Sequence, residues 1–197
     1  MRPGAPVGAG RPYAFLLLAG GLLGLAASAV LTVDKIRLLQ NPGYRPNCNI
    51  NPVISCGSVV QTAQAEAFGF PNSLIGLAAF GALAAVGTGL VAGAVYHRWF
   101  WLGLQTGTLL GLGFVLWLID QALYDIGALC PYCMVVWAVM LPLCWYTALH
   151  LLRSGVLPAP RWWPAVARWH WVVPAVWYLG IALLILNRFW SYWRTLL

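Results

Sequence analysis

The chain has 197 residues, of which 61% are hydrophobic and only 8% carry a charge. Soluble domains contain about 25% charged residues, so this composition excludes an ordinary water-soluble fold and favours a membrane protein. The formal net charge is +7, but the basic residues are scattered along the chain. This distribution argues against a nucleic-acid-binding surface, and we expect no nucleic acid partner.

Five apolar runs follow one another along the chain, each close to the ~20 residues with which a helix crosses the hydrocarbon core. None shows the period-two alternation of a strand, and an open sheet edge cannot face lipid. We therefore predict an all-α membrane protein. The runs cover approximately residues 13–33, 74–95, 99–119, 134–152 and 171–186, the last being the shortest.

The first apolar run has a second interpretation. Arg2 and Arg11 precede it, and Ala26–Ala29 reads AASA, a combination typical of a cleaved signal peptide. The run is long for the apolar part of a signal peptide, which favours a retained helix. In both cases the segment that begins at Asp34 emerges on the far side of the membrane.

The distribution of charges indicates how the chain is oriented. The acidic residues fall on or near one side, whereas most arginines outside the apolar runs fall on the other. The positive-inside rule then places the N-terminus in the cytoplasm, and five spans place the C-terminus outside. The acidic residues are Asp34, Glu66, Asp120 and Asp125.

Glycines recur at a spacing of four in the third run, at Gly103, Gly107 and Gly111. Small residues at this spacing let the backbones of two membrane helices approach closely. We therefore predict that this face packs tightly against a neighbouring helix.

The five cysteines divide into two pairs and a single residue. Cys48 and Cys56 lie in the first outer loop, and Cys130 and Cys133 form the motif CPYC just before the fourth run. Because two spans separate the loops, both pairs lie on the same side of the membrane whichever way the protein inserts. Cys144 falls among apolar residues inside the fourth run, and we expect a small buried hydrophobe there.

Four thiols on one side leave three interpretations open. Two static disulfides would brace the loops in an oxidising compartment. A site of four thiolates would bind zinc, although structural zinc usually sits in soluble ribbons. A redox-active dithiol is favoured by the position of CPYC, because Cys130 can cap the fourth helix and Pro131 suits its first turn. A helix start and the C-x-x-C spacing both favour a thiolate, and Cys133 follows about one turn in.

The first outer loop contains the second cysteine pair, with which that dithiol could exchange a disulfide. Residues 56–70 read as a short helix that begins at Cys56, ends near Gly69 and can roof a pocket between the spans. Cys48 precedes it in residues 41–52, a stretch rich in Pro, Asn and Gly that we expect to be mobile. A mobile thiol that meets a soluble partner and an anchored thiol that faces CPYC would form a relay. The natural electron acceptor in the surrounding lipid is a quinone.

Three features together resemble the vitamin K epoxide reductase family: Cys48 and Cys56 with seven residues between them, PNSLIG at Pro71–Gly76, and CPYC at a helix start. The resemblance covers about residues 12–152. It implies a four-helix transmembrane bundle around a quinone, here with a fifth transmembrane helix outside it and a short half-helix in the first periplasmic loop. The expected division is a cytoplasmic tail (1–11), the redox domain (12–152), a cytoplasmic loop (153–170) and a fifth helix with an interfacial tail (171–197).

The resemblance also implies roles for single residues. Cys130 and Cys133 would be the quinone-facing pair, with Cys133 next to the ring, and Cys48 and Cys56 the shuttle pair. Asn72 would donate a hydrogen bond to a quinone carbonyl; as an alternative, it caps the second helix. No residue is expected to bind a metal.

One position departs from the vertebrate pattern. Trp137 stands where vertebrate members of the family carry a tyrosine. Its indole N–H can donate a hydrogen bond but cannot accept one, which argues against an epoxide and leaves a quinone as the substrate. Ordinary helix packing is the alternative role for this side chain.

We therefore predict a quinone-dependent thiol-disulfide oxidoreductase of the bacterial inner (cell) membrane, with its cysteine pairs on the extracytoplasmic side. It would re-oxidise a DsbA-like thioredoxin-fold partner and pass electrons to menaquinone or ubiquinone, supporting disulfide formation. The sequence contains no thioredoxin domain, so we expect the partner to act in trans. The alternatives are a vitamin K epoxide or quinone reductase, and a non-catalytic membrane scaffold with structural disulfides.

Overall fold

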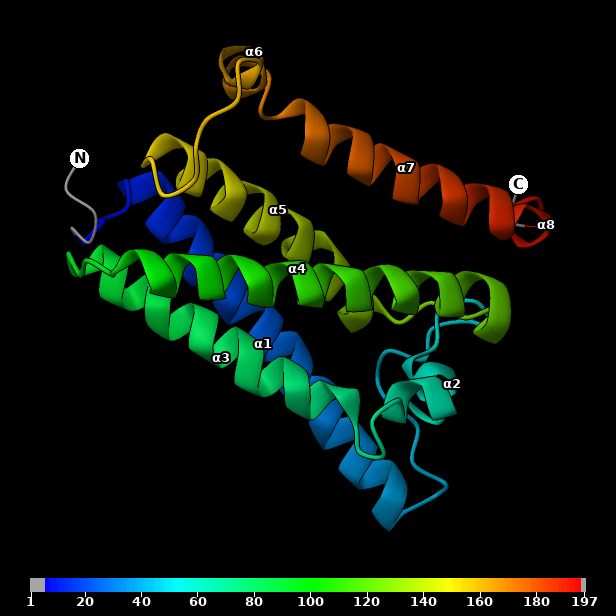
Figure 1. Ribbon diagram of the computed structural model, residues 1–197. Helices are drawn as coiled ribbons and strands as arrows, with labels where there is room; N and C mark the ends of the chain where they lie inside the picture. The colour runs from blue at the N-terminus through cyan, green and yellow to red at the C-terminus, as the bar shows by residue number, and fades with distance from the viewer. Residues whose placement is uncertain (1–5, 196–197) are drawn as a thin grey trace.

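The computed structural model describes residues 6–195, and all its regular elements within that range are helices. Four of them are long and apolar enough to cross a membrane, and they lie together as one group (Figure 1). The prediction of an all-α membrane protein is confirmed. The four helices are α1 (Arg11–Gln40), α3 (Asn72–Val91), α4 (Arg98–Asp120) and α5 (Pro131–Arg153).

Two of the long helices extend further than the apolar runs predicted. α1 continues past Asp34 and Lys35 to Gln40, because both charged side chains are buried against the first loop instead of marking the end of the helix. α4 continues into a π-helical turn, η2 (Gln121–Ile126), before Gly127 ends it in the left-handed conformation. Charged residues at the ends of apolar runs therefore did not coincide with the ends of these helices.

The predicted short helix in the first loop is present in two pieces. α2 (Cys56–Val60) begins at Cys56 as expected, and a 3-10 turn, η1 (Ala63–Glu66), follows it. Thr62 separates the two, and its hydroxyl donates to the carbonyl oxygen of Val59 at 2.8 Å. The segment ends at Gly69, whose φ of +80° suits glycine and returns the chain to α3.

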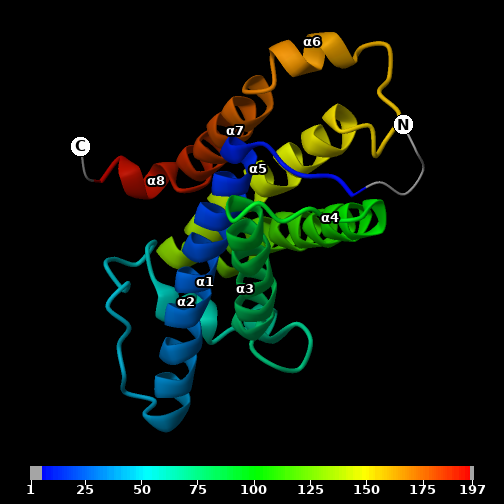
Figure 2. The same cartoon turned by 90° about the vertical axis from the view of Figure 1, so that its left-hand side faces the viewer.

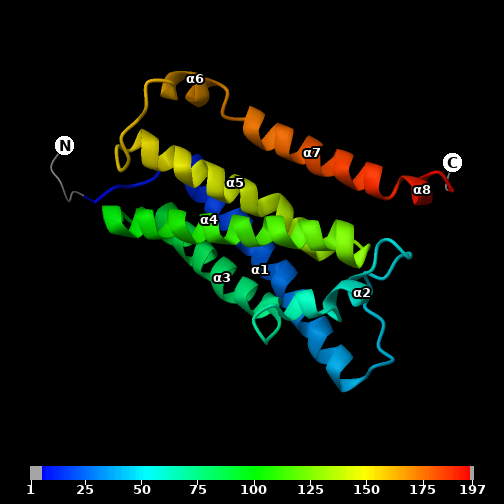
Figure 3. The same ribbon diagram turned by 45° about the vertical axis from the view of Figure 1, so that its right-hand side comes forward.

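The C-terminal part lies outside the four-helix group. α6 (Trp163–Arg168) leads into α7 (Val172–Arg188) and the short α8 (Trp190–Trp193), and α7 runs alongside α5 (Figures 1 and 3). α7 has 17 residues, slightly fewer than the ~20 that a helix needs to cross the hydrocarbon. Its role as a fifth span remains a prediction.

The four long helices do not close into a symmetric bundle. α1 packs along α3 and also against α5, and α4 packs against α5. α3 and α4 meet at the loop of residues 92–97 and then diverge toward the end of the molecule that carries α2 (Figures 1 and 2). This divergence positions the candidate site.

Candidate active site

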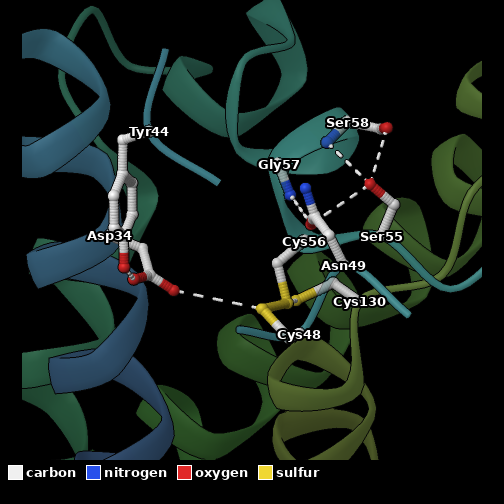
Figure 4. Close-up of a disulfide and its surroundings, with 9 residues drawn as sticks. All are labelled: Asp34, Tyr44, Cys48, Asn49, Ser55, Cys56, Gly57, Ser58 and Cys130. Atoms are coloured by element: carbon white, nitrogen blue, oxygen red, sulfur yellow. Dashed lines mark hydrogen bonds between the residues drawn. A yellow bond between two sulfur atoms is a disulfide. The ribbon is translucent and has the colours of Figure 1, made fainter. Parts of the chain in front are cut away.

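A short parallel bridge joins the two cysteine loops. The N–H of Leu129 donates to the carbonyl oxygen of Val53 at 2.7 Å, and the N–H of Ser55 donates to the carbonyl oxygen of Leu129 at 2.9 Å. The bridge pairs Ile54 with Leu129, and a cysteine follows shortly after each of them, Cys56 two residues later and Cys130 one residue later. Their sulfur atoms lie 3.3 Å apart (Figure 4). The bridge therefore brings together residues 74 positions apart in the chain.

The structure contains one disulfide, between Cys48 and Cys56, which we call the outer pair. Cys130 and Cys133, the inner pair, are free thiols. Cys56 is 0% and Cys130 1% exposed, so the contact between the two pairs is shielded from water. The two pairs occupy the same end of the molecule, as the count of spans between them required.

The inner pair lies at the start of α5 in the arrangement that CPYC predicted. Cys130 is the N-cap residue and Pro131 occupies the first turn. Hydrogen bonds from the Cys133 thiol, and from the backbone N–H groups of Cys133 and Tyr132, lower the pKa of Cys130. They outweigh burial and the negative charge of Asp34, which act in the opposite direction. Cys130 is therefore predisposed to react as a thiolate.

Cys48 is buried, with only 7% of its surface exposed, on the segment that we expect to be mobile. The turns predicted around it are present and are held by side-chain amides. The Asn51 side chain accepts from the N–H of Ile54 at 2.7 Å, and the Asn49 side chain accepts from the N–H of Gly57 at 2.8 Å. A soluble partner would reach the Cys48 sulfur only after this loop is displaced.

A cavity of about 510 Å³ opens between α3 and α4, with α1 and α5 behind it. The segment that was predicted to roof a pocket contributes residues of α2 and η1 to its lining. Both inner cysteines line it, so the inner pair separates the outer pair from the cavity. Most of the remaining lining is apolar, and the other polar members are Ser28, Lys35, Thr62, Gln64, Asn72, Ser73 and Thr108.

Trp137 lines the same cavity one turn after Cys133. It is 3% exposed, and its indole N–H has no hydrogen-bond partner among residues 6–195. A buried donor without an acceptor is unfavourable, so the side chain has an unused hydrogen bond to give. An apolar cavity with such a donor fits a ligand that is mostly hydrocarbon and carries a carbonyl oxygen.

The profile of the Vitamin K epoxide reductase family matches residues 15–148. The chain belongs to this family. No curated protein matches it. As a member, it is a membrane oxidoreductase of a family that uses quinones and generally works with thioredoxin-fold proteins. The matched range contains both cysteine pairs, Asn72 and Trp137.

In this family member Asn72 ties the roof of the cavity to α3. It is the first residue of the helix, and its side chain does not cap it. Its amide oxygen accepts from the N–H of Ala67 at 3.2 Å, and its amide nitrogen donates to the carbonyl oxygen of Gln64 at 2.7 Å. Within residues 6–195 the amide nitrogen makes this one hydrogen bond, and Asn72 lines the cavity. The capping alternative is therefore wrong, and the role toward a quinone stays a proposal.

The glycine repeat of α4 does not serve the predicted close packing of two helices. Gly103 and Gly107 line the cavity, and a Cβ added at either would meet no other part of the described chain within 4 Å. Only at Gly111 would it meet a neighbouring side chain, the flexible end of Met140 on α5. The prediction was wrong because α3 and α4 diverge where these glycines face the gap.

Lys35 was missed as a site residue. Its ammonium group pairs with Glu66 of η1 at 2.8 Å and donates to the carbonyl oxygen of Val60 at 3.0 Å. The side chain is 10% exposed and fixes the roof segment to α1. Lys35 is the chain's one lysine and directly follows Asp34 at the end of an apolar run, which was the available signal.

The zinc alternative finds no support in the described part of the chain. No group of three or more His, Cys, Asp or Glu side chains there is arranged to hold a metal ion. The disulfide also engages two of the four sulfur atoms that a tetrathiolate site would need.

Proposed function

We propose that the protein re-oxidises a DsbA-like thioredoxin-fold protein outside the cytoplasm and passes the electrons to a membrane quinone, menaquinone or ubiquinone. The observation that carries this proposal is the 3.3 Å separation of the Cys56 and Cys130 sulfur atoms. At that distance a thiolate on one of them can attack the other once it is part of a disulfide.

The cycle begins with the inner pair oxidised. A thiolate of the reduced partner attacks Cys48, the Cys48–Cys56 bond breaks, and Cys56 leaves with the electron pair. Cys56 attacks Cys130 and releases Cys133 as a thiolate. The second thiol of the partner then closes the partner's own disulfide and releases Cys48.

Cys48 completes the transfer by attacking Cys56, which re-forms the outer disulfide and releases Cys130. The partner has lost two electrons and two protons, and the inner pair has gained them as a dithiol. An oxidised outer pair beside a reduced inner pair is the arrangement that the structure contains. In the proposed cycle, this arrangement would precede the transfer of electrons toward the cavity.

The residues around the cavity fit a quinone head group. Trp137 would donate its unpaired indole N–H, and Asn72 its second amide hydrogen, to the quinone carbonyl oxygens, since both residues line the cavity. A quinone bound there would accept two electrons and two protons. Donors that are already oriented stabilise negative charge as it develops on an oxygen, without reorganisation of solvent. Cys133 lines the cavity and would face this acceptor.

Purified protein in nanodiscs, mixed with a reduced thioredoxin-fold protein and a short-chain ubiquinone, tests the proposal by quinone absorbance. We expect turnover that is lost on changing any of the four paired cysteines to serine and kept in the matched variant Cys144→Ser. Cys133→Ala should also accumulate a Cys56–Cys130 disulfide, detectable by peptide mapping. Quinone reduction that persists in Cys56→Ser would contradict the relay.

Two parallel measurements address the alternatives. Vitamin K epoxide supplied in place of the quinone tests the reductase alternative directly. Static disulfides of a scaffold should resist a mild dithiol, whereas a relay disulfide should open readily.

A further inference from the structure

The outer disulfide lies beside a buried carboxylate that the relay does not use. Asp34 belongs to α1, whereas the disulfide belongs to the first loop. The side chain is buried between them, with an exposure of 6%. One carboxylate oxygen accepts from the Tyr44 hydroxyl at 3.0 Å, and Tyr44 accepts in turn from the Arg37 guanidinium at 3.3 Å. The other oxygen points at the Cys48 sulfur, 3.9 Å away (Figure 4).

Within residues 6–195, no group donates to that second oxygen in the oxidised protein. A disulfide sulfur carries no hydrogen, so Cys48 cannot donate to Asp34 while it is bonded to Cys56. Within residues 6–195 no basic side chain forms an ion pair with Asp34, because the adjacent Lys35 pairs with Glu66. A buried carboxylate oxygen without a donor is unfavourable.

Reduction of the outer pair removes this deficit. When the Cys48–Cys56 bond breaks and Cys48 takes up a proton, its thiol can donate to the second carboxylate oxygen of Asp34. Hydrogen bonds to an ionised group are stronger than those between neutral groups. The carboxylate therefore favours the reduced outer pair over the oxidised one.

We propose that Asp34 is a positioning residue that makes the outer disulfide easier to reduce, by holding the proton of the Cys48 thiol. An external dithiol loses two electrons and two protons and becomes a disulfide, and Cys48 and Cys56 become thiols, one of them bound to Asp34. The value of this bias for accepting electrons rests on the relay proposed above.

The test needs neither a redox partner nor a quinone, so its failure is distinguishable from failure of the relay. Protein that carries Cys130→Ser and Cys133→Ser retains the outer pair alone and is equilibrated with reduced and oxidised dithiothreitol. The reduced fraction is read by alkylation and mass spectrometry. Asp34→Asn in this background should lower the equilibrium constant for reduction about ten-fold, or about 30 mV for a two-electron couple.

Three further variants separate this effect from damage to the fold. Asp34→Glu keeps the carboxylate and should recover part of the loss. Asp120→Asn removes an exposed carboxylate from the same end of the molecule and should leave the equilibrium unchanged. Tyr44→Phe removes the other donor to Asp34. The hydrogen bond from the Cys48 thiol should then stabilise the carboxylate more strongly, so the disulfide should become easier to reduce.

The outcomes divide cleanly. Opposite shifts in Asp34→Asn and Tyr44→Phe support the proposal, because general loosening of the loop would move both in the same direction. An unchanged equilibrium in Asp34→Asn overturns it, as does a shift toward easier reduction in that variant. Equal shifts of Asp34→Asn and Tyr44→Phe in one direction also overturn it.

Discussion

The two sides of α3 use small residues in opposite ways. On the side of α1, a Cβ added to Gly21 would lie 2.8 Å from the Cα of Ala84, and one added to Gly87 would lie 2.6 Å from the Cα of Leu18. On the side of α4, Gly103 and Gly107 face the cavity and no packed neighbour. One set of glycines closes a helix interface, and the other helps to keep a gap open.

A missing side chain has two physical uses in a membrane protein. It lets two backbones approach until dispersion contacts hold them together, or it leaves volume that a lipid-soluble ligand can fill. The residue type is the same in both uses. The direction of the neighbouring helix decides between them.

The largest effect is expected from a substitution that forces α1 and α3 apart at their tight interface. Gly87→Val places a branched side chain against the backbone of Leu18, which cannot rotate away as a side chain can. We expect a loss of about 3 kcal/mol or more and a melting temperature lower by roughly 10 °C. Thermal unfolding in detergent measures it, with Gly107→Val as the control at the open gap. Equal losses in both variants would remove the distinction between the two sides.

At the wide end of the gap, Asn72→Ala removes the two hydrogen bonds that hold the roof and one donor beside the cavity. Quinone turnover should fall roughly 100-fold, the effect typical of losing an oriented donor. The loss of stability should be smaller by comparison, about 1–2 kcal/mol for the two hydrogen bonds. Thr88→Ala, at the far end of the same helix, is the control and should retain turnover. A melting temperature that falls while turnover holds would return Asn72 to a purely structural role.

Filling the gap from α4 should have a smaller effect on turnover. Gly107→Leu projects a side chain into the cavity, and we expect about ten-fold slower quinone reduction with no loss of stability, since leucine favours a helix more than glycine does. Gly113→Leu is the matched control, because Gly113 also has free space around it but does not line the cavity. The assay is quinone reduction driven by dithiothreitol. Equal rates for the two variants would show that the cavity is not where the acceptor binds.

The smallest effect is expected at Trp137. Trp137→Phe keeps an aromatic ring but removes the N–H, and loss of one neutral hydrogen bond should slow quinone reduction about three- to ten-fold. Trp177→Phe provides the control, because the Trp177 indole nitrogen is also buried with no hydrogen-bond partner among residues 6–195 but does not line the cavity. An equal effect in both variants would count against a hydrogen bond from Trp137 to the acceptor.

The sequence alone determined the membrane helices, the shared side of the two cysteine pairs and the start of α5. Apolar runs of about 20 residues predict membrane helices because an unpaired backbone group is too costly in lipid. The number of spans between two loops determines that both cysteine pairs share one side. The start of α5 follows from the local chemistry of Cys130 and Pro131, which needs no distant contact.

Other features depended on contacts between segments far apart in the chain. The pairing of the loops at Leu129 decided that Cys130 meets Cys56, and the angle between α3 and α4 decided that the glycines of α4 face a cavity. Asp34 and Lys35 looked like the charged end of a membrane helix, yet both are buried by the first loop. Local sequence determines where the backbone forms helices and which segments favour lipid. The burial of a side chain and the residues it contacts depend on segments that only folding brings together.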